Sequence, residues 1–179
     1  RRQPLGLEQR RADTRTLDLP PGKLLSISSK SELAFVRNQT FMTLLLQPGI
    51  LVRAGLEGGI GRDLLEHVQA ADWSPDGTQL AVARNFEGKV RLEYPLGKAL
   101  YETRSPISDV RISRDGTWIA FLERVESGVV VAAIRVSDGS RRVLTEGWFT
   151  AAGLAWSADG REIWFTPQKQ VRDSSPPLL

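Results

Sequence analysis

One short pattern recurs three times along the chain and limits what it can fold into. Each copy reads as a short apolar strand, a Ser-x-Asp-Gly turn and a second strand with large apolar side chains; the copies span residues 71–83, 110–121 and 154–165. Glycine accepts the positive φ that other residues avoid, and the aspartate carboxylate accepts hydrogen bonds from the backbone of its own turn. Each copy therefore predicts a β-hairpin.

The spacing of the copies favours one architecture. The turn aspartates Asp76, Asp115 and Asp159 are separated by 39 and 44 residues (115 − 76 and 159 − 115). One four-stranded blade of a β-propeller takes about 40 to 50 residues. No stretch shows the sustained 3.6-residue apolar period of a helical solenoid. The sequence thus predicts an all-β fold, a β-propeller of four-stranded antiparallel blades.

A fourth, degenerate copy precedes the other three at residues 25–36. It keeps the aliphatic-Ser start and the apolar end, but Ser31 stands where the turn glycine is expected and no aspartate precedes it. Its distance from Gly77, 46 residues (77 − 31), still fits one blade. Four copies that begin inside one blade and end after the second strand of another predict a partial propeller of about three blades, because closed propellers typically have about four to eight.

The pattern also divides the chain into three parts. Residues 1–22 form a terminal arm, in which 16–19 are compatible with the outer strand of a preceding blade. Residues 23–166 hold the blades, and residues 167–179 are expected to be irregular or disordered. Four further segments are expected within the blades: a short outer strand at 62–66, a separate strand at 68–73 that opens the next blade, a continuation of that blade at 96–102, and an apolar run without alternation at 41–46.

The formal net charge of +3 lies in the arm. Residues 1–23 carry six basic and three acidic side chains, so the remaining 18 basic and 18 acidic residues balance. A phosphate-binding surface needs basic residues concentrated on the folded body. We therefore expect no nucleic-acid partner.

Two further absences exclude classes of chemistry and membrane insertion. The sequence has no cysteine, which excludes disulfides and thiolate catalysis but leaves the compartment, extracytoplasmic or cytoplasmic, open. No run approaches the roughly 20 apolar residues of a membrane span. We expect no membrane span in this chain.

Residues that perform chemistry in other proteins have structural explanations here. His67 is the only histidine and has no Gly-x-Ser-x-Gly elbow beside it, so we expect it between blades. The glycine-rich stretch 55–61 lacks the Gly-Lys-Ser/Thr of a phosphate loop and is predicted to be a turn. We predict no catalytic residue, no cofactor and no metal site, and a structural role for the residues of the repeat turns: Asp76, Gly77, Asp115, Gly116, Asp159 and Gly160.

Aromatic residues fall into two groups. One group recurs with the repeat and is predicted to pack between blades: Trp73, Trp118, Trp156 and Trp164. Trp148 and Phe149 lie outside the repeat, in what we expect to be an inter-blade loop. This pair is the candidate for contact with a partner.

The repeat motifs point to a known family. The segments 73–77, 113–116 and 156–160, each followed by an apolar strand, resemble the TolB-type, WD-like propeller repeats of bacteria, and the similarity covers about residues 23–166. Ser31 in the first copy and Arg114 in the second depart from that pattern.

A narrower resemblance concerns the segments 91–98, 100–103 and 153–156. They are similar to propeller modules attached C-terminally to bacterial eukaryotic-type Ser/Thr protein kinases. That resemblance implies a sensing or protein-binding role, and the chain itself has neither the His-Arg-Asp nor the Asp-Phe-Gly motif of a kinase.

Two classes of function are compatible with these observations. The first is a non-enzymatic propeller that binds a protein or a small ligand, as part of a larger bacterial protein such as a receptor-like Ser/Thr kinase. The second is the propeller portion of a prolyl-oligopeptidase-like hydrolase whose catalytic domain lies outside this chain. The first is favoured, because the repeats come without a catalytic cluster. The expected partners are further propeller blades of the parent protein or another subunit.

Overall fold

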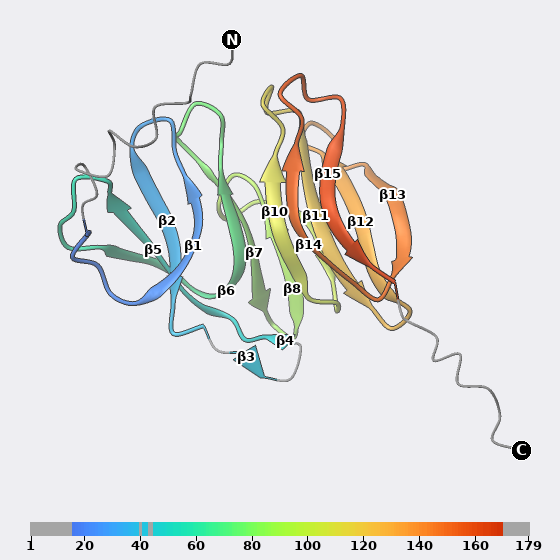
Figure 1. Cartoon of the computed structure of the whole chain (residues 1–179), viewed down its shortest axis with the longest axis horizontal. Coiled ribbons are helices and arrows are strands. Elements are labelled where there is room, and N and C mark those ends of the chain that lie inside the picture. The colour runs from blue at the N-terminus through green and yellow to red at the C-terminus, as the bar shows by residue number, and fades with distance from the viewer. Residues whose placement is uncertain (1–15, 40, 43–44, 170–179) are drawn as a thin grey trace, which may run out of the picture.

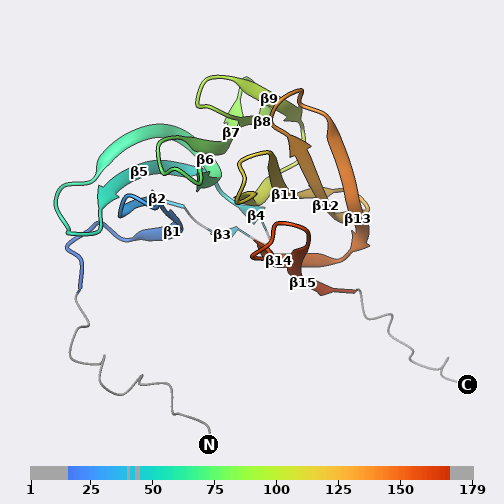
Figure 2. The same cartoon turned by 90° about the horizontal axis from the view of Figure 1, so that it is seen from above.

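The computed structural model describes residues 16–39, 41–42 and 45–169. Every regular element in this part of the chain is a β-strand, and neighbouring strands within each sheet pair antiparallel. Seen from above, the sheets stand side by side along an arc, in chain order (Figure 2). The described residues form no helix that is long and apolar enough to cross a membrane.

The strands group into three four-stranded blades and one half-blade (Figure 1). Blade A consists of β1 (Gly22–Ile27), β2 (Glu32–Arg37), β5 (Gly49–Gly55) and the first half of β6 (Arg62–Trp73). Blade B consists of the second half of β6, β7 (Leu80–Phe86), β8 (Lys89–Glu93) and β9 (Ala99–Thr103). Blade C consists of β10 (Ile107–Ile112), β11 (Trp118–Val125), β12 (Gly128–Arg135) and β13 (Arg141–Trp148). Half-blade D has only β14 (Thr150–Trp156) and β15 (Ile163–Gln168).

This architecture confirms the predicted all-β fold of four-stranded antiparallel blades and the partial propeller. The apolar run at 41–46 contributes β3 (Phe41–Met42) and β4 (Leu45–Leu46), a small separate hairpin between β2 and β5. β15 continues two residues past the boundary predicted at 166. The rest of the predicted tail and most of the predicted arm lie outside the described residues.

The two strands expected at 62–66 and 68–73 are one continuous strand, β6. Its first half pairs with β5 and its second half with β7, so blades A and B belong to one seven-stranded sheet. The register shifts on either side of His67, which has a φ of 60°. A local irregularity of this kind turns a strand without ending it. The other correction is β9, which begins at Ala99 because Leu96, Gly97 and Lys98 belong to the preceding turn and connection.

The apolar core lies between the blades. Alternate residues of each blade point to opposite faces, so every internal blade packs on both sides. Trp73 and Val82 belong to the cluster between blades A and B, Phe121 and Leu92 to that between B and C, and Leu154 to that between C and D.

The outer face of blade A is covered in a different way. Leu17 and Leu19 pack against the cluster formed by Phe35, Val52 and their neighbours on the face that points away from blade B. Residues 16–19, which the sequence suggested as the outer strand of a preceding blade, form no strand. They instead cover the first blade of the chain itself.

The repeated turns share one hydrogen-bond pattern. In the turn of blade B, the Gly77 amide donates to the Ser74 carbonyl (2.8 Å) and the Gln79 amide donates to the Ser74 hydroxyl oxygen (2.9 Å). The Ser74 hydroxyl donates in turn to Asp76 (2.5 Å). The same bonds are made around Ser113 in blade C and Ser157 in half-blade D.

The degenerate copy in blade A keeps this turn without its Asp-Gly pair. The Ser31 amide donates to the Ser28 carbonyl (3.1 Å), and the Glu32 amide donates to the Ser28 hydroxyl oxygen (3.0 Å). Ser31 adopts the glycine conformation, with a φ of 60°. This turn is one residue shorter than the others, since Glu32 follows Ser28 by four residues whereas Gln79 follows Ser74 by five, but the starting serine makes the same two kinds of bond.

Candidate functional site

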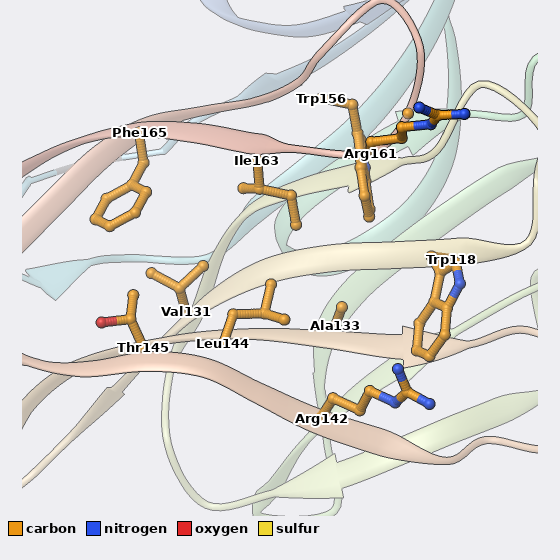
Figure 3. Close-up of a pocket in the computed structure, with 11 residues that line it drawn as sticks. Trp118, Val131, Ala133, Arg142, Leu144, Thr145, Trp156, Arg161, Ile163 and Phe165 are labelled. Atoms are coloured by element: carbon orange, nitrogen blue, oxygen red, sulfur yellow. The ribbon is translucent and has the colours of Figure 1, made fainter.

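A cleft of about 420 Å³ lies between blade C and half-blade D. Figure 3 shows its two walls: one comes from β11, β12 and β13, and the other from β14, β15 and the turn between them. The lining is mostly apolar and aromatic, with two arginines: Trp118, Val131, Ala133, Arg142, Leu144, Thr145, Trp156, Gly160, Arg161, Ile163 and Phe165.

The cleft lies beside β15, the last strand of half-blade D among the described residues. In blades A to C, a third and a fourth strand follow the hairpin and extend the packing outward. In half-blade D the described strands stop at β15, so Leu144 on β13 has no blade opposite it and is 47% exposed. Trp164 on β15 is 62% exposed. The sequence interpretation that placed Trp164 between blades is therefore wrong, since its side chain points away from the packed face of β15.

One end of the cleft is aromatic and cationic. The Arg142 and Arg135 guanidinium carbons lie 5.0 and 5.1 Å from the Trp118 ring centroid, at cation–π distance. Figure 3 places Arg142 and Trp118 at the same end of the cleft as Arg161 and Trp156. Arg142 and Arg161 form no ion pair with any residue of the described part of the chain. This end of the cleft therefore offers positive charge to an anionic group.

Buried and half-buried polar side chains join the blades in two places. Near the innermost strands, Asp72 accepts hydrogen bonds from the Ser26 hydroxyl (2.5 Å) in blade A and from the Ile112 amide (2.8 Å) in blade C. Gln69 accepts from the Ile107 amide (2.8 Å), also in blade C. Burial raises the pKa of Asp72 above its ordinary value, although these hydrogen bonds and the Arg111 charge act in the opposite direction.

Farther out, Glu123 links blades B and C. Its carboxylate is 3% exposed and accepts hydrogen bonds from Thr103 (2.7 Å), Tyr101 (3.1 Å) and Arg141 (2.7 Å). Burial, followed by the nearby Glu123 charge, raises the pKa of the Tyr101 hydroxyl. The Glu123 carboxylate thus binds Thr103 and Tyr101 of blade B as well as Arg141 of its own blade. These bonds stabilise the packing of the two blades and leave none of the four groups free to react.

His67 does not lie beside a nucleophile. It is exposed at the point where β6 passes from blade A to blade B, next to a cleft of about 410 Å³. The lining of that cleft contains charged and aliphatic residues and no serine, threonine or tyrosine: Ile50, Asp63, Leu64, Leu65, Glu66, His67 and Arg84. Within the described ranges no cluster of His, Asp and Glu has the geometry of a metal site.

The predicted turn residues lie where the repeat placed them. Gly77, Gly116 and Gly160 have φ values of 66°, 73° and 71°. The pKa of each turn aspartate is lowered, and the largest cause is the hydrogen bond from the serine hydroxyl two residues earlier: Ser74 to Asp76, Ser113 to Asp115 and Ser157 to Asp159. These carboxylates bind their own turns and do not converge on one point.

The predicted partner pair Trp148 and Phe149 is divided by the structure. Trp148 is the last residue of β13, not part of a loop, and its ring meets Phe165 edge-on at a centroid distance of 5.8 Å. Its indole N–H is buried without a hydrogen-bond partner. Phe149 lies between β13 and β14 and is 46% exposed. Only Phe149 keeps the exposure that a partner contact needs.

The cleft residues Arg142, Leu144 and Ile163 were missed because only the arrangement of strands brings them together.

Solved structures share this architecture. TolB from Acinetobacter baumannii matches with a TM-score of 0.59 and 19% sequence identity, over 84% of this chain and 37% of that chain. A protein assigned as TolB from Agrobacterium tumefaciens matches with a TM-score of 0.54 and 12% identity, over 72% of this chain and 50% of that chain. Neither a protein-family model nor a curated protein matches the chain.

The chain thus spans half or less of the length of the TolB structures that it matches. At these identities the similarity establishes the fold, a TolB-like β-propeller. The family resemblance predicted from the repeats is confirmed at that level.

Proposed function

We propose that this chain is a non-catalytic binding module, the propeller portion of a larger bacterial protein such as a receptor-like Ser/Thr kinase. The observation that carries the proposal is the composition of the cleft between blade C and half-blade D. Its walls supply apolar and aromatic surface and two arginines, which suit the binding of a partner, but no nucleophile paired with a base.

The polar residues elsewhere support the same conclusion. Asp72, Gln69 and Glu123 are engaged in bonds between blades, and the repeat aspartates bind their own turns. A propeller of this kind is a rigid scaffold on which loops and strand edges recognise partners. The predicted partners are further blades of the parent protein or another subunit, and a protein ligand suits the extended cleft.

Binding can be tested with a phage-displayed library of random peptides, panned against the purified chain. We expect the selected peptides to bind the folded chain and to lose binding when it is thermally unfolded. A library that yields no such peptide would contradict a protein-binding function.

Catalysis can be tested with p-nitrophenyl acetate, a fluorogenic peptide and ATP. We expect turnover no higher than in buffer, because the only histidine has no nucleophile beside it. Turnover that disappears in His67→Ala would overturn the non-catalytic assignment and favour the hydrolase alternative. A hydrolase domain encoded in the same reading frame would also favour it, whereas a kinase domain there would support the receptor-like assignment.

A further inference from the structure

We propose that half-blade D binds an extended segment of a partner protein, which adds a strand to the open edge of β15 and places a carboxylate beside Arg142 and Arg161. This inference rests on the proposed binding function and specifies its site and the chemistry of the partner. Three observations carry it: the backbone of the edge, the shape of the cleft and the charge at one end.

The edge of β15 is available for pairing. On the side of β14, the carbonyls of Glu162 and Gln168 accept hydrogen bonds from the amides of Ser157 and Phe149, both at 2.9 Å. Backbone groups alternate between the two edges of a strand, so Ile163 and Phe165 present their amides and carbonyls to the other edge. No described strand pairs there. Pro167, which has no N–H, ends the usable edge.

The shape of the cleft specifies the side chains of the added strand. In blade C the third strand, β12, packs Val130, Ala132 and Ile134 against blade B. Its other face packs Val131 and Ala133 toward half-blade D. A strand in the corresponding position beside β15 would face blade C across the cleft. We therefore expect it to carry small aliphatic residues at alternate positions, as in other cases where an extended peptide extends a sheet.

The charge of the cleft specifies one end of the added strand. β12 runs antiparallel to β11, and just past its end the Val136 amide donates to the carbonyl of Thr117, the residue that corresponds to Arg161 in the repeat. Val136 packs against the cluster between blades B and C. An added strand in the same relation to β15 would place the residue after its end beside Arg161, on the face that points across the cleft to Arg142. An acidic residue there would meet two arginines that form no ion pair within the described residues.

Two native carboxylates lie close to that end but are otherwise engaged. Glu162 accepts a hydrogen bond from the Trp164 indole (3.0 Å), and both residues alternate with Ile163 and so lie on the other face of β15. Asp159 accepts bonds from the Ser157 hydroxyl (2.6 Å) and the Arg161 amide (3.1 Å). The arginine side chains are left for an incoming group.

The probe is a pair of fluorescein-labelled peptides with the sequence of residues 128–136, β12 and the residue after it, both amidated at the C-terminus. One carries Val136→Arg and the other carries Val136→Glu. We expect the glutamate peptide to bind the whole chain roughly tenfold more tightly in a fluorescence anisotropy titration, since the other peptide sets like charges together. Binding should also slow hydrogen exchange at the amides of Ile163 and Phe165.

A charge reversal of the cleft provides the decisive control. The double variant Arg142→Glu/Arg161→Glu should prefer the arginine peptide, and this regained binding would itself show that the variant is folded. Arg62→Glu changes an exposed arginine on blade A and should leave the preference unchanged. Equal binding of both peptides, no binding, or an unchanged preference in the double variant would overturn the proposal.

Other occupants give distinct results. A peptide of residues 170–179 that displaces the probe would assign the edge to the chain's own following segment and overturn the partner assignment. A concentration-dependent dimer that protects Ile163 and Phe165 would assign it to a second copy. Library peptides that bind without protecting those amides would leave the proposed function standing and refute only this site.

Discussion

At the scale of single residues, the turn glycines share one backbone conformation but differ in their surroundings. Gly77 and Gly160 have φ values of 66° and 71°. A Cβ at Gly77 would lie 2.8 Å from the Ser29 Oγ of the neighbouring blade and 3.2 Å from the Lys30 amide nitrogen, whereas a Cβ at Gly160 would meet nothing within 4 Å. The turn of blade B is thus also a contact with blade A.

We expect this difference to appear in stability. Gly77→Ala should lower the free energy of unfolding by about 2–3 kcal/mol, from the positive φ together with the collision, and Gly160→Ala by only about 1 kcal/mol. Chemical denaturation of the two variants would measure both values. Equal losses would mean that the Gly77 turn does not touch blade A.

Ser31 offers the opposite test, because it occupies the glycine conformation of the degenerate turn with φ at 60°. Ser31→Gly should raise the free energy of unfolding by about 0.5–1 kcal/mol, as relief of the left-handed strain exceeds the added entropy of the unfolded chain. The melting temperature measures this gain, and Lys30→Gly, in the same turn but without a positive φ, is the control. A loss of stability in Ser31→Gly would show that the serine side chain holds the turn.

At the scale of elements, Asp72 ties the inner strands of three blades through β1, β6 and β10. Asp72→Ala would leave the Ile112 amide without its acceptor and should cost about 1–3 kcal/mol in unfolding free energy. Asp72→Asn keeps an acceptor oxygen and should cost less. Urea denaturation at neutral pH would compare them, and equal costs would mean that the hydrogen bond to β10 contributes nothing.

The difference in stability between the wild type and Asp72→Asn should depend on pH with a defined sign. The pKa of Asp72 is raised in the folded state, so above the ordinary aspartate value of about 4 the folded chain holds a proton that the unfolded chain has lost. The stability of the wild type relative to Asp72→Asn should therefore fall as pH rises from about 4 through the raised pKa. The turn aspartates, whose pKa values are lowered, cancel in this difference. A difference that grows with pH would contradict the burial of Asp72.

The elements also show what the sequence could and could not reveal. The hairpins around Asp76, Asp115 and Asp159 were predictable because their turn chemistry is local. The continuity of β6 was not, since the bend at His67 lets one strand serve two blades and no residue type marks it. Trp164 resembled the packed tryptophans because its place in the repeat is similar, yet its exposure depends on the strands beyond it.

At the scale of the whole molecule, the two ends of the arc are unequal. Leu17 and Leu19 cover part of blade A, where Leu24 and Ile27 on β1 stay exposed, while Leu144 of blade C and Trp164 of half-blade D are exposed at the other end. The partial propeller and its number of blades could be predicted from repeat spacing, but this asymmetry could not, because Leu17 and Leu19 belong to no repeat. The cleft was likewise hidden, since its walls come from strands of two blades and only the packing of these blades brings the lining side chains together.

We expect the asymmetry to be visible with a dye that fluoresces on exposed apolar surface. The double variant Leu144→Ser/Trp164→Ser should bind less dye than the wild type, and Leu17→Ser/Leu19→Ser should bind more. Ile60→Ser, at an exposed loop position, is the control and should change little. A wild-type chain that is a monodisperse 19.8 kDa monomer and binds no dye would contradict an open end.

The continuous strand β6 has a consequence for how the molecule opens and closes locally. Because the backbone ladder runs unbroken from β1 to β9, blades A and B cannot separate without breaking the pairs that β6 makes on both sides. Blade C forms a sheet of its own and joins its neighbours only through side chains and hydrogen bonds to single backbone groups. The first two blades should therefore behave as one cooperative opening unit and blade C as another, with half-blade D the first to fray.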